Sequence, residues 1–441
     1  MRPTFHNEKE ALAQIQEQVT ALAQAAAAAE AWYRRYTEDI ERRLRQSLAD
    51  AQSELDRTVS QLEGEHRGLL TKVGEQLAQI QVECGAWVLP WGDATWATYQ
   101  PGTEIPIPYL TRLGPMKVAG QCHSLDTVAL LPIIGGRNVV IKAAGAAKSQ
   151  AVQVAQSLVL RLLLTTPPAK LRLLLIDPVG LGQNVAGFMH LADYAEELVG
   201  GKAWTEPQHI EKELAALSSH MELVIQKYLR NRYRTMEEYN AEAGEVAEPY
   251  RLLVAVHFPV NFTAEAARRL ISITTNGPRC GVYALVLVDT EQPLPHGFNP
   301  ADLERTASVI AWDGQRFVWQ DDDFRDALLS LDNPPALEQF ERLVHLVGQA
   351  AKEAGRVEVS FARVAPPRPD RWKGRTSAGL QVALGRAGAR QLQYLSLGEG
   401  TAQHALVAGR TGAGKSNLMH VLITGLALTY PPEELQLYLV D

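Results

Sequence analysis

The chain has 441 residues, of which 46% are hydrophobic and 21% are charged, and its formal net charge is −7. This length exceeds one ordinary domain, and the composition is that of a globular protein, which excludes a wholly disordered chain. The negative net charge excludes a global field that attracts DNA or an acidic membrane, so a polyanion would bind only at a local patch or in a pore assembled from several subunits.

Residues 1–83 are predicted to form a coiled coil. Between Leu12 and Ile80, apolar residues recur mostly at alternating steps of three and four, which is the seam of a heptad repeat. A polar helix of this length is rarely stable alone, so we expect it to associate with a partner helix. The glycines near His66 leave a break or a hairpin open.

A connector and an α/β domain follow the helix. Residues 84–117 are rich in Trp, Pro and Gly, and we expect their tryptophans to pack against the next domain. Over residues 118–330, apolar runs alternate with helical patterns. The runs are continuous, as in a parallel sheet buried on both faces, and they read NVVIKAA, LRLLLIDP, YRLLVAVHF and GVYALVLVD. The sequence therefore predicts an open α/β sheet, followed over residues 331–375 by a helix and a proline-rich linker.

Residues 376–441 contain a complete phosphate-loop pattern, G-x-x-x-x-G-K-[ST]. The glycines let the backbone turn its N–H groups towards phosphate oxygens at the start of a helix. The lysine supplies a positive charge for the β- and γ-phosphates, and the serine hydroxyl is suited to Mg²⁺. The loop predicts a site for ATP and Mg²⁺, with Ser416 as the metal ligand, made by Gly409, Arg410, Thr411, Gly412, Ala413, Gly414, Lys415, Ser416 and Asn417.

An earlier segment repeats this pattern. Residues 141–178 and 406–441 both run through a strand, a loop of small residues, Lys-Ser, an amphipathic helix, a Pro-Pro turn and an apolar strand that ends in Asp. Lys148 thus corresponds to Lys415. Such self-similarity predicts two related units in one chain.

The first copy lacks parts of the phosphate-binding chemistry. Lys142 and Ala147 replace the opening and penultimate glycines, and a Cβ there disfavours the positive φ angles and the close approach that the phosphates need. The YRLLVAVHF run offers His257 near its end and no carboxylate for Mg²⁺. Asp441, which ends a strand 26 residues after Lys415, is a candidate for the Mg²⁺ carboxylate, but it matches Asp177 in the repeat, and we favour a loop-leading position for both. We expect the first copy to bind nucleotide weakly or not at all.

The stretch HALVAGRTGAGKSNLMHVLITGLALTYPPEELQLYLVD resembles the start of the ATPase domain of the FtsK/SpoIIIE group in the FtsK–HerA superfamily. The stretch NGPRCGVYALVLVDT is similar to a late strand of that family and draws attention to Arg279. The resemblance implies RecA-like domains, assembly into hexameric rings and ATP-driven translocation of double-stranded DNA. It makes residues 118–330 a degenerate domain of this kind and residues 376–441 the N-terminal part of a second one.

We therefore expect the N-terminal portion of a soluble, cytoplasmic DNA translocase, a P-loop ATPase whose first ATPase-like domain is structural or regulatory. A type VII secretion-like ATPase that moves protein, or a coiled-coil scaffold without activity of its own, remains an alternative. No stretch is apolar enough for a signal peptide or a membrane span, and the scattered cysteines suit a reducing compartment. We assign no catalytic residue, because no later strand supplies a carboxylate, and expect these 441 residues alone not to turn over ATP.

Overall fold

The structure is a computed structural model. It describes residues 8–102, 109–119, 124–230, 232–354, 359–388, 391–398, 400, 402–410 and 412–440. The chain forms two units, the helical segment that ends at Leu77 and the part from Ala78 onward. Across the described ranges, no helix is both long enough and apolar enough to cross a membrane.

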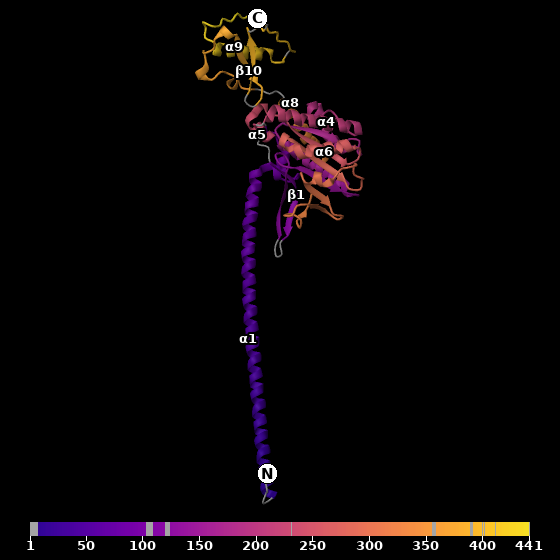
Figure 1. The fold of residues 1–441 in the computed structure, drawn as a ribbon, viewed down its shortest axis with the longest axis vertical. Helices are drawn as coiled ribbons and strands as arrows, with labels where there is room; N and C mark the ends of the chain where they lie inside the picture. The colour runs from indigo at the N-terminus through magenta and orange to yellow at the C-terminus, as the bar shows by residue number, and fades with distance from the viewer. Residues whose placement is uncertain are drawn as a thin grey trace. The chain divides into compact units, whose positions relative to one another are not determined.

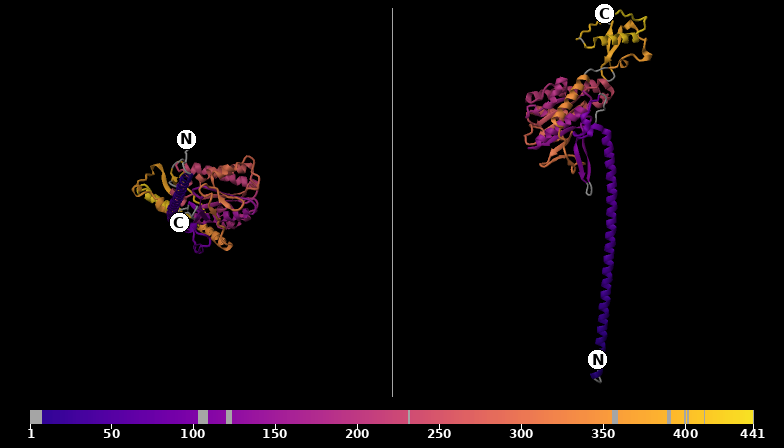
Figure 2. Two further views of the ribbon diagram at one scale, coloured as in Figure 1. Left: turned by 90° about the horizontal axis from the view of Figure 1, so that it is seen from below. Right: turned by 180° about the vertical axis from the view of Figure 1, so that it is seen from behind.

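The first element is a single helix, α1, from Glu8 to Cys84 (Figures 1 and 2). It continues without a break past His66, so no hairpin forms there. A glycine inside a helix costs only about 1 kcal/mol relative to alanine, which is too little to end a helix of this length. The large seam residues of α1 that are exposed are Leu12, Ile15, Val19, Leu22, Tyr33, Tyr36, Ile40, Leu44, Leu48, Leu55, Val59, Leu62, Val73 and Ile80. The coiled coil itself stays a prediction.

The central element of the second unit is a six-stranded sheet. Its strands are β3 (Asn138–Ala143), β4 (Leu171–Ile176), β5 (Tyr250–Phe258), β6 (Val282–Asp289), β7 (Ala307–Trp312) and β8 (Phe317–Trp319). The order is β4-β5-β6-β3-β7-β8, and all pairs are parallel except β7 with β8. The predicted α/β fold with a buried parallel sheet is confirmed.

Helices connect and cover these strands. They are α2 (Ala147–Thr165), α3 (Ala186–Met189), α4 (Pro207–Leu223), α5 (Met236–Ala243), α6 (Ala264–Asn276), α7 (Pro300–Glu304) and α8 (Leu337–Ala354). The helix α2 packs on β3, β6 and α8, whereas α4 packs on α6, which in turn packs on β6. Burial of these helices fixes the loops at the carboxyl edge of the sheet, where strands β3 and β6 end.

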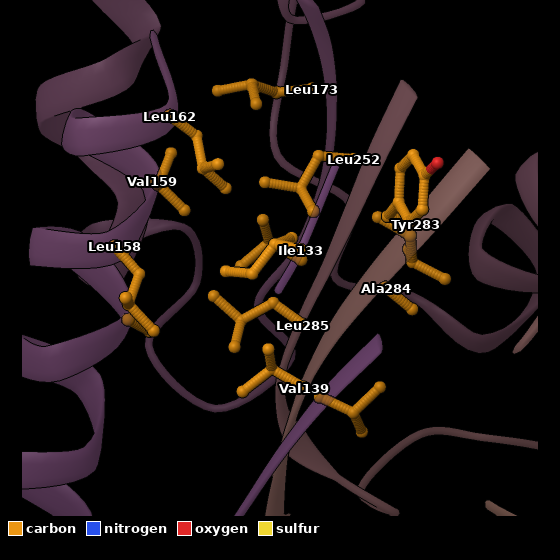
Figure 3. Close-up of a cluster of buried hydrophobic side chains, with 14 of the residues drawn as sticks. Ile133, Val139, Leu158, Val159, Leu162, Leu173, Leu252, Tyr283, Ala284 and Leu285 are labelled. Carbon is orange, nitrogen blue, oxygen red and sulfur yellow. The ribbon is translucent and has the colours of Figure 1, made fainter. Parts of the chain in front are cut away.

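One part of the hydrophobic core lies between α2 and the sheet (Figure 3). Leu158 and Leu162 of α2 face Val139 of β3 and Leu285 of β6, and each of these side chains is at most 2% exposed. Every third or fourth residue of α2 returns to this face, which is why a sequence with that spacing forms the covering helix. The helix therefore holds a fixed position over the strand that leads into its own N-terminal loop.

A small antiparallel sheet flanks the large one, with strands β1 (Leu110–Ala119), β2 (Ser124–Pro132) and β9 (Leu328–Leu329). The predicted domain boundary at residue 117 falls inside β1. In the connector, Trp96 is fully buried and the indole N–H of Trp91 donates to Ser157 Oγ at 2.8 Å. The packing predicted for these two tryptophans is confirmed.

The C-terminal part contains a β-hairpin and a helix, β10 (Leu380–Arg386), β11 (Leu392–Leu397) and α9 (Lys415–Thr429). Val382, Leu426 and Tyr430 form its own small core. The prediction of strands on both sides of α9 is wrong for the described residues, since Leu406 is 95% exposed and Val440 is 98% exposed, and neither segment pairs. A strand exists only where a neighbour satisfies its backbone groups.

Candidate functional site

The phosphate loop of the C-terminal part precedes α9, which begins at Lys415. Gly412 and Gly414 have φ angles of 81° and 86°, in the left-handed region that a Cβ disfavours. Gly409 does not need a positive φ angle. The expected positive φ angle is therefore present at the penultimate glycine and absent at the opening one.

Lys415 lies folded over its own loop. Its Nζ atom donates to the carbonyl oxygens of Gly409 at 2.8 Å and Arg410 at 2.9 Å. The side chains of Ser416 and Asn417, in the first turn of α9, are exposed. The structure thus brings the predicted lysine and serine together at a helix N-terminus, the arrangement that attracts anions. Thr411 lies outside the described residues, as does Asp441.

The carboxylate of Glu434 joins two segments of the C-terminal part. Glu434, in the predicted Pro-Pro turn, accepts hydrogen bonds from the Thr376 backbone at 2.9 Å and from Arg375 Nη1 at 2.9 Å. The pKa of Glu434 is lowered to about 2, chiefly by the hydrogen bond from the Thr376 backbone and then by the bond from Arg375. The PPEEL segment therefore fastens the end of α9 to the start of the hairpin.

The first copy of the loop has a different backbone. The helix α2 already begins at Ala147, one position earlier than α9 in the repeat, and Ala146 before it is right-handed with φ −67°. Gly145 alone takes a positive φ angle here, 52°, among the loop residues Ala144 to Ala147. The missing glycine thus leaves a helical turn where the second copy has its left-handed Gly414.

The lysine of the first copy is engaged by acidic side chains. Lys148 Nζ lies 2.8 Å from Asp289 Oδ2 and 2.6 Å from Glu291 Oε2. These hydrogen bonds, first to Asp289 and then to Glu291, raise the pKa of Lys148. Lys142, at the opening position, lies in β3 and pairs with Glu304 at 2.8 Å.

Sequence reasoning missed Asp289 and Glu291. The signal was present, because the GVYALVLVDTE run ends in two acids, and the strand order places that run directly beside the loop strand β3. The run forms β6, which lies between β3 and β5. The acidic residues at the end of β6 and the lysine of α2 therefore meet at one edge of the sheet. Adjacent strands in space are not adjacent in the sequence, which is why the pairing was not predicted.

The neighbouring strands end in a polar network. Asp177 is fully buried and accepts hydrogen bonds from the backbone N–H groups of Gly180, Gly182 and Asn184 at 3.0 to 3.1 Å. It therefore leads into and orders a loop, as predicted. Asn184 Nδ2 also lies 3.4 Å from His257 Nε2.

His257, the residue before the last in β5, has a left-handed conformation with φ 59°, and burial lowers the pKa of its imidazole. The neutral imidazole forms a hydrogen-bonded pair with Asn184, which gives it a structural role. It supplies no carboxylate for Mg²⁺. Arg279, which the resemblance had marked, donates through Nε to the Arg234 carbonyl at 2.9 Å on the exposed surface.

The fold and the loops define a class of protein. A parallel sheet with the loop strand β3 between β6 and β7, and with a lysine-serine loop leading into a helix, is typical of RecA-like P-loop domains. The sequence profile of the FtsK/SpoIIIE family matches the chain twice, over residues 115–365 and 367–441, and the chain belongs to this family. The resemblance described from the sequence is confirmed. No curated protein sequence matches the chain.

Several solved structures are similar to the chain. One shows ATPases 2 and 3 of EssC from Geobacillus thermodenitrificans, with 15% identity, a TM-score of 0.44 and coverage of 75% of this chain and 67% of that one. Another shows ATPases 2 and 3 of EccC from Thermomonospora curvata with a signal sequence peptide, with 17% identity, a TM-score of 0.40 and coverage of 74% and 62%. A third is the pCW3 conjugation coupling protein TcpA with ATPgS, with 12% identity, a TM-score of 0.34 and coverage of 51% and 57%.

Proposed function

We propose that this chain is part of an ATP-driven motor and that residues 409–417 bind ATP with Mg²⁺. The observation that carries the proposal is the left-handed pair Gly412 and Gly414 directly before Lys415 at a helix start. Lys415 contacts only neutral carbonyl oxygens in the described loop, at 2.8 and 2.9 Å, and a phosphate replaces such partners with a stronger ionic one. Ser416 supplies the hydroxyl for Mg²⁺.

The two lysines of the repeat give a matched pair for testing this proposal. Lys415→Ala removes the point charge for the phosphates, and we expect at least a tenfold loss of ATP affinity, or ~1.4 kcal/mol. Lys148→Ala removes a lysine already paired with two acids, and we expect unchanged affinity. The measurement is titration of the 441-residue protein with a fluorescent ATP analogue in the presence of Mg²⁺.

An equal loss of affinity in both variants would place nucleotide in both loops and contradict the assignment. A loss in Lys148→Ala alone would move the site to the first copy. Unchanged binding in Lys415→Ala would refute the proposal for residues 409–417.

The first domain, which we place at residues 118–330, serves in this proposal as a structural or regulatory partner of the ATP-binding segment. Its support is the pairing of Lys148 with Asp289 and Glu291, together with the absence of any carboxylate among the last residues of β5, where His257 and Phe258 stand. Residues 376–441 are proposed as the beginning of the active domain.

We propose double-stranded DNA as the polymer that the motor moves, in keeping with the family to which the chain belongs. Protein is the second candidate, because one of the similar structures, EccC, holds a signal sequence peptide. ATP turnover by the protein as it occurs in the cell separates the two. Stimulation by duplex DNA supports the first, and stimulation by a helical protein without nucleic acid supports the second.

We also propose that α1 associates with the α1 of a second copy, which would help to assemble a ring. The support is the row of exposed apolar side chains between Leu12 and Ile80. An apolar stripe of this length is stable in water only when another helix covers it.

A further inference from the structure

We propose that the carboxylate of Glu291 is a built-in anion of the first loop and occupies the place of a phosphate. The proposal concerns Ala143 to Ser149 and the end of β6, and it holds whether or not the second loop works as proposed above. It explains which group lies in the first loop, which has kept Lys148 but has Ala147 in place of the penultimate glycine.

Two neighbours place the carboxylate. Glu291 Oε2 lies 2.6 Å from Lys148 Nζ, in the first turn of α2. Gly145, the loop's one left-handed residue among those described, lies beside this carboxylate, since a Cβ built on it would be 4.0 Å from Glu291 Oε1, and after the hydrogen bond from Lys148 its backbone also lowers the pKa of Glu291. A loop amide and the lysine at the helix start are the two kinds of donor that hold phosphate in an intact loop.

The backbone around Glu291 is fixed against the loop strand. Thr290 N–H donates to the carbonyl of Ala143 at 3.1 Å, and the Glu291 N–H donates to Asp289 Oδ1 at 3.1 Å. Asp289 ends β6 with its side chain only 5% exposed, and it is the other partner of Lys148. The acidic segment is therefore held beside the loop by backbone hydrogen bonds as well as by the ion pairs.

The charge balance of the first loop argues against a second anion. One lysine faces two carboxylates. Burial raises the pKa of Asp289, but its hydrogen bonds, the one from Lys148 first, outweigh burial and lower the pKa, and the hydrogen bond from Lys148 also lowers the pKa of Glu291, so both stay ionised at neutral pH. A phosphate that entered would meet two like charges at close range. In the second copy, by contrast, Lys415 contacts backbone carbonyls and carries its charge unneutralised by those partners.

The arrangement lets the first domain hold its loop and β6 together without nucleotide. Here a side chain of the chain itself, Glu291, joins these two elements through Lys148. Glu291 is thus a positioning residue that keeps α2 and β6 in one fixed relation.

Chemical rescue by an added anion tests the proposal. All variants carry Lys415→Ala, so that the second loop does not contribute. In this background Glu291→Gln removes the built-in charge while keeping the side-chain shape, and we expect a lower Tm that rises with added pyrophosphate. The parent is expected to show no such rise, because its site is already filled. The matched control is Glu304→Gln, which breaks the 2.8 Å pair with Lys142 in β3, away from Lys148 and Glu291, and gains no response to pyrophosphate.

A further variant keeps the test decisive. Adding Lys148→Met to Glu291→Gln removes the donor, and the response to pyrophosphate should then disappear. Equal responses in the parent, Glu291→Gln and Glu304→Gln would show an unspecific salt effect and overturn the proposal. The same conclusion follows if Glu291→Gln does not respond at all, or if the variant with Lys148→Met still responds.

Discussion

Lys148 and Lys415 show how neighbours decide what one residue type does. Both lie in the first turn of a helix after a loop of small residues. Lys148 has two carboxylates within 2.8 Å, whereas Lys415 donates to two backbone carbonyls of its own loop. An ion pair with a carboxylate is harder to displace than a neutral hydrogen bond, so only the second lysine is poised for phosphate.

At the same scale, Glu434 makes the C-terminal part sensitive to acid. Its folded pKa, about 2, lies below the ordinary value of a glutamate because Thr376 and Arg375 donate to it. A lowered folded pKa stabilises the protein fully above the ordinary pKa of about 4.3, and this contribution is lost as the pH falls from there through 2.

We therefore expect Glu434→Gln to lower the Tm of the C-terminal part at neutral pH. The difference between wild type and variant should shrink between about pH 5 and about pH 2, as protonation removes the charge from the wild-type side chain. Circular dichroism melts at several pH values measure it. A difference that stays constant over this range would contradict the role given to the charge.

At the scale of elements, α1 carries a surface that its own unit does not cover. Steps of three and four alternate from Leu12 to Tyr36, and steps of four then recur to Leu48, so the apolar seam rotates slowly around the helix. Ion pairs one turn apart, such as Arg45 with Glu41 at 2.9 Å, support the helix on its polar side. The seam itself is left for another helix.

Charges placed on the seam should therefore prevent association. Burial of a leucine contributes about 1.5 to 3 kcal/mol, so Leu44→Glu together with Leu48→Glu should weaken self-association more than tenfold. Light scattering at several concentrations measures the effect. Ser53→Glu, on the side of the helix away from Leu55, is the matched control and should leave the association unchanged. A wild-type protein that remains a monomer at all concentrations would refute the self-association.

The C-terminal elements show a limit of local patterns. The apolar segments around α9 have strand-like sequences, yet among the described residues they pair with no neighbour. The hairpin of β10 and β11 packs on α9 instead, through Val382, Leu426 and Tyr430. Strand propensity is realised only when the tertiary structure supplies an adjacent edge.

At the scale of the whole second unit, one buried charge cluster joins distant parts of the chain. Asp332 Oδ2 lies 2.7 Å from Arg112 Nε of β1 and 3.0 Å from Arg161 Nη2 of α2. The side chains of the two arginines are 6% and 1% exposed, and the Arg161 guanidinium lies 4.2 Å from the centre of the Trp91 ring. The cluster ties the connector, the small sheet and the helix after the first loop together.

Removal of the shared carboxylate should be costly, because it leaves two buried cations without their counter-ion. We expect Asp332→Ala to lower the free energy of unfolding by about 3–5 kcal/mol. Urea denaturation measures it. Asp322→Ala, which breaks a pair whose carboxylate is 92% exposed, is the matched control and should change stability by less than about 1 kcal/mol. Similar losses of unfolding free energy in the two variants would show that the cluster contributes no more stability than an exposed ion pair.

Features that depend on short stretches of residues could be predicted before the structure was known. Hydrophobic spacing predicted α1 and the alternation of buried strands with helices, and the complete pattern from Gly409 to Ser416 identified the phosphate loop and the family. These features depend on residues within one or two turns of each other, so local patterns are sufficient to find them.

The partners of the first loop, by contrast, depend on contacts between residues far apart in the sequence. Lys148 and Asp289 are 141 positions apart and meet because β6 lies beside β3 in the sheet. Arg112 and Asp332 are 220 positions apart and meet for a similar reason. Strand order is set by how helices and strands bury their apolar faces together, and no short stretch of sequence records that choice.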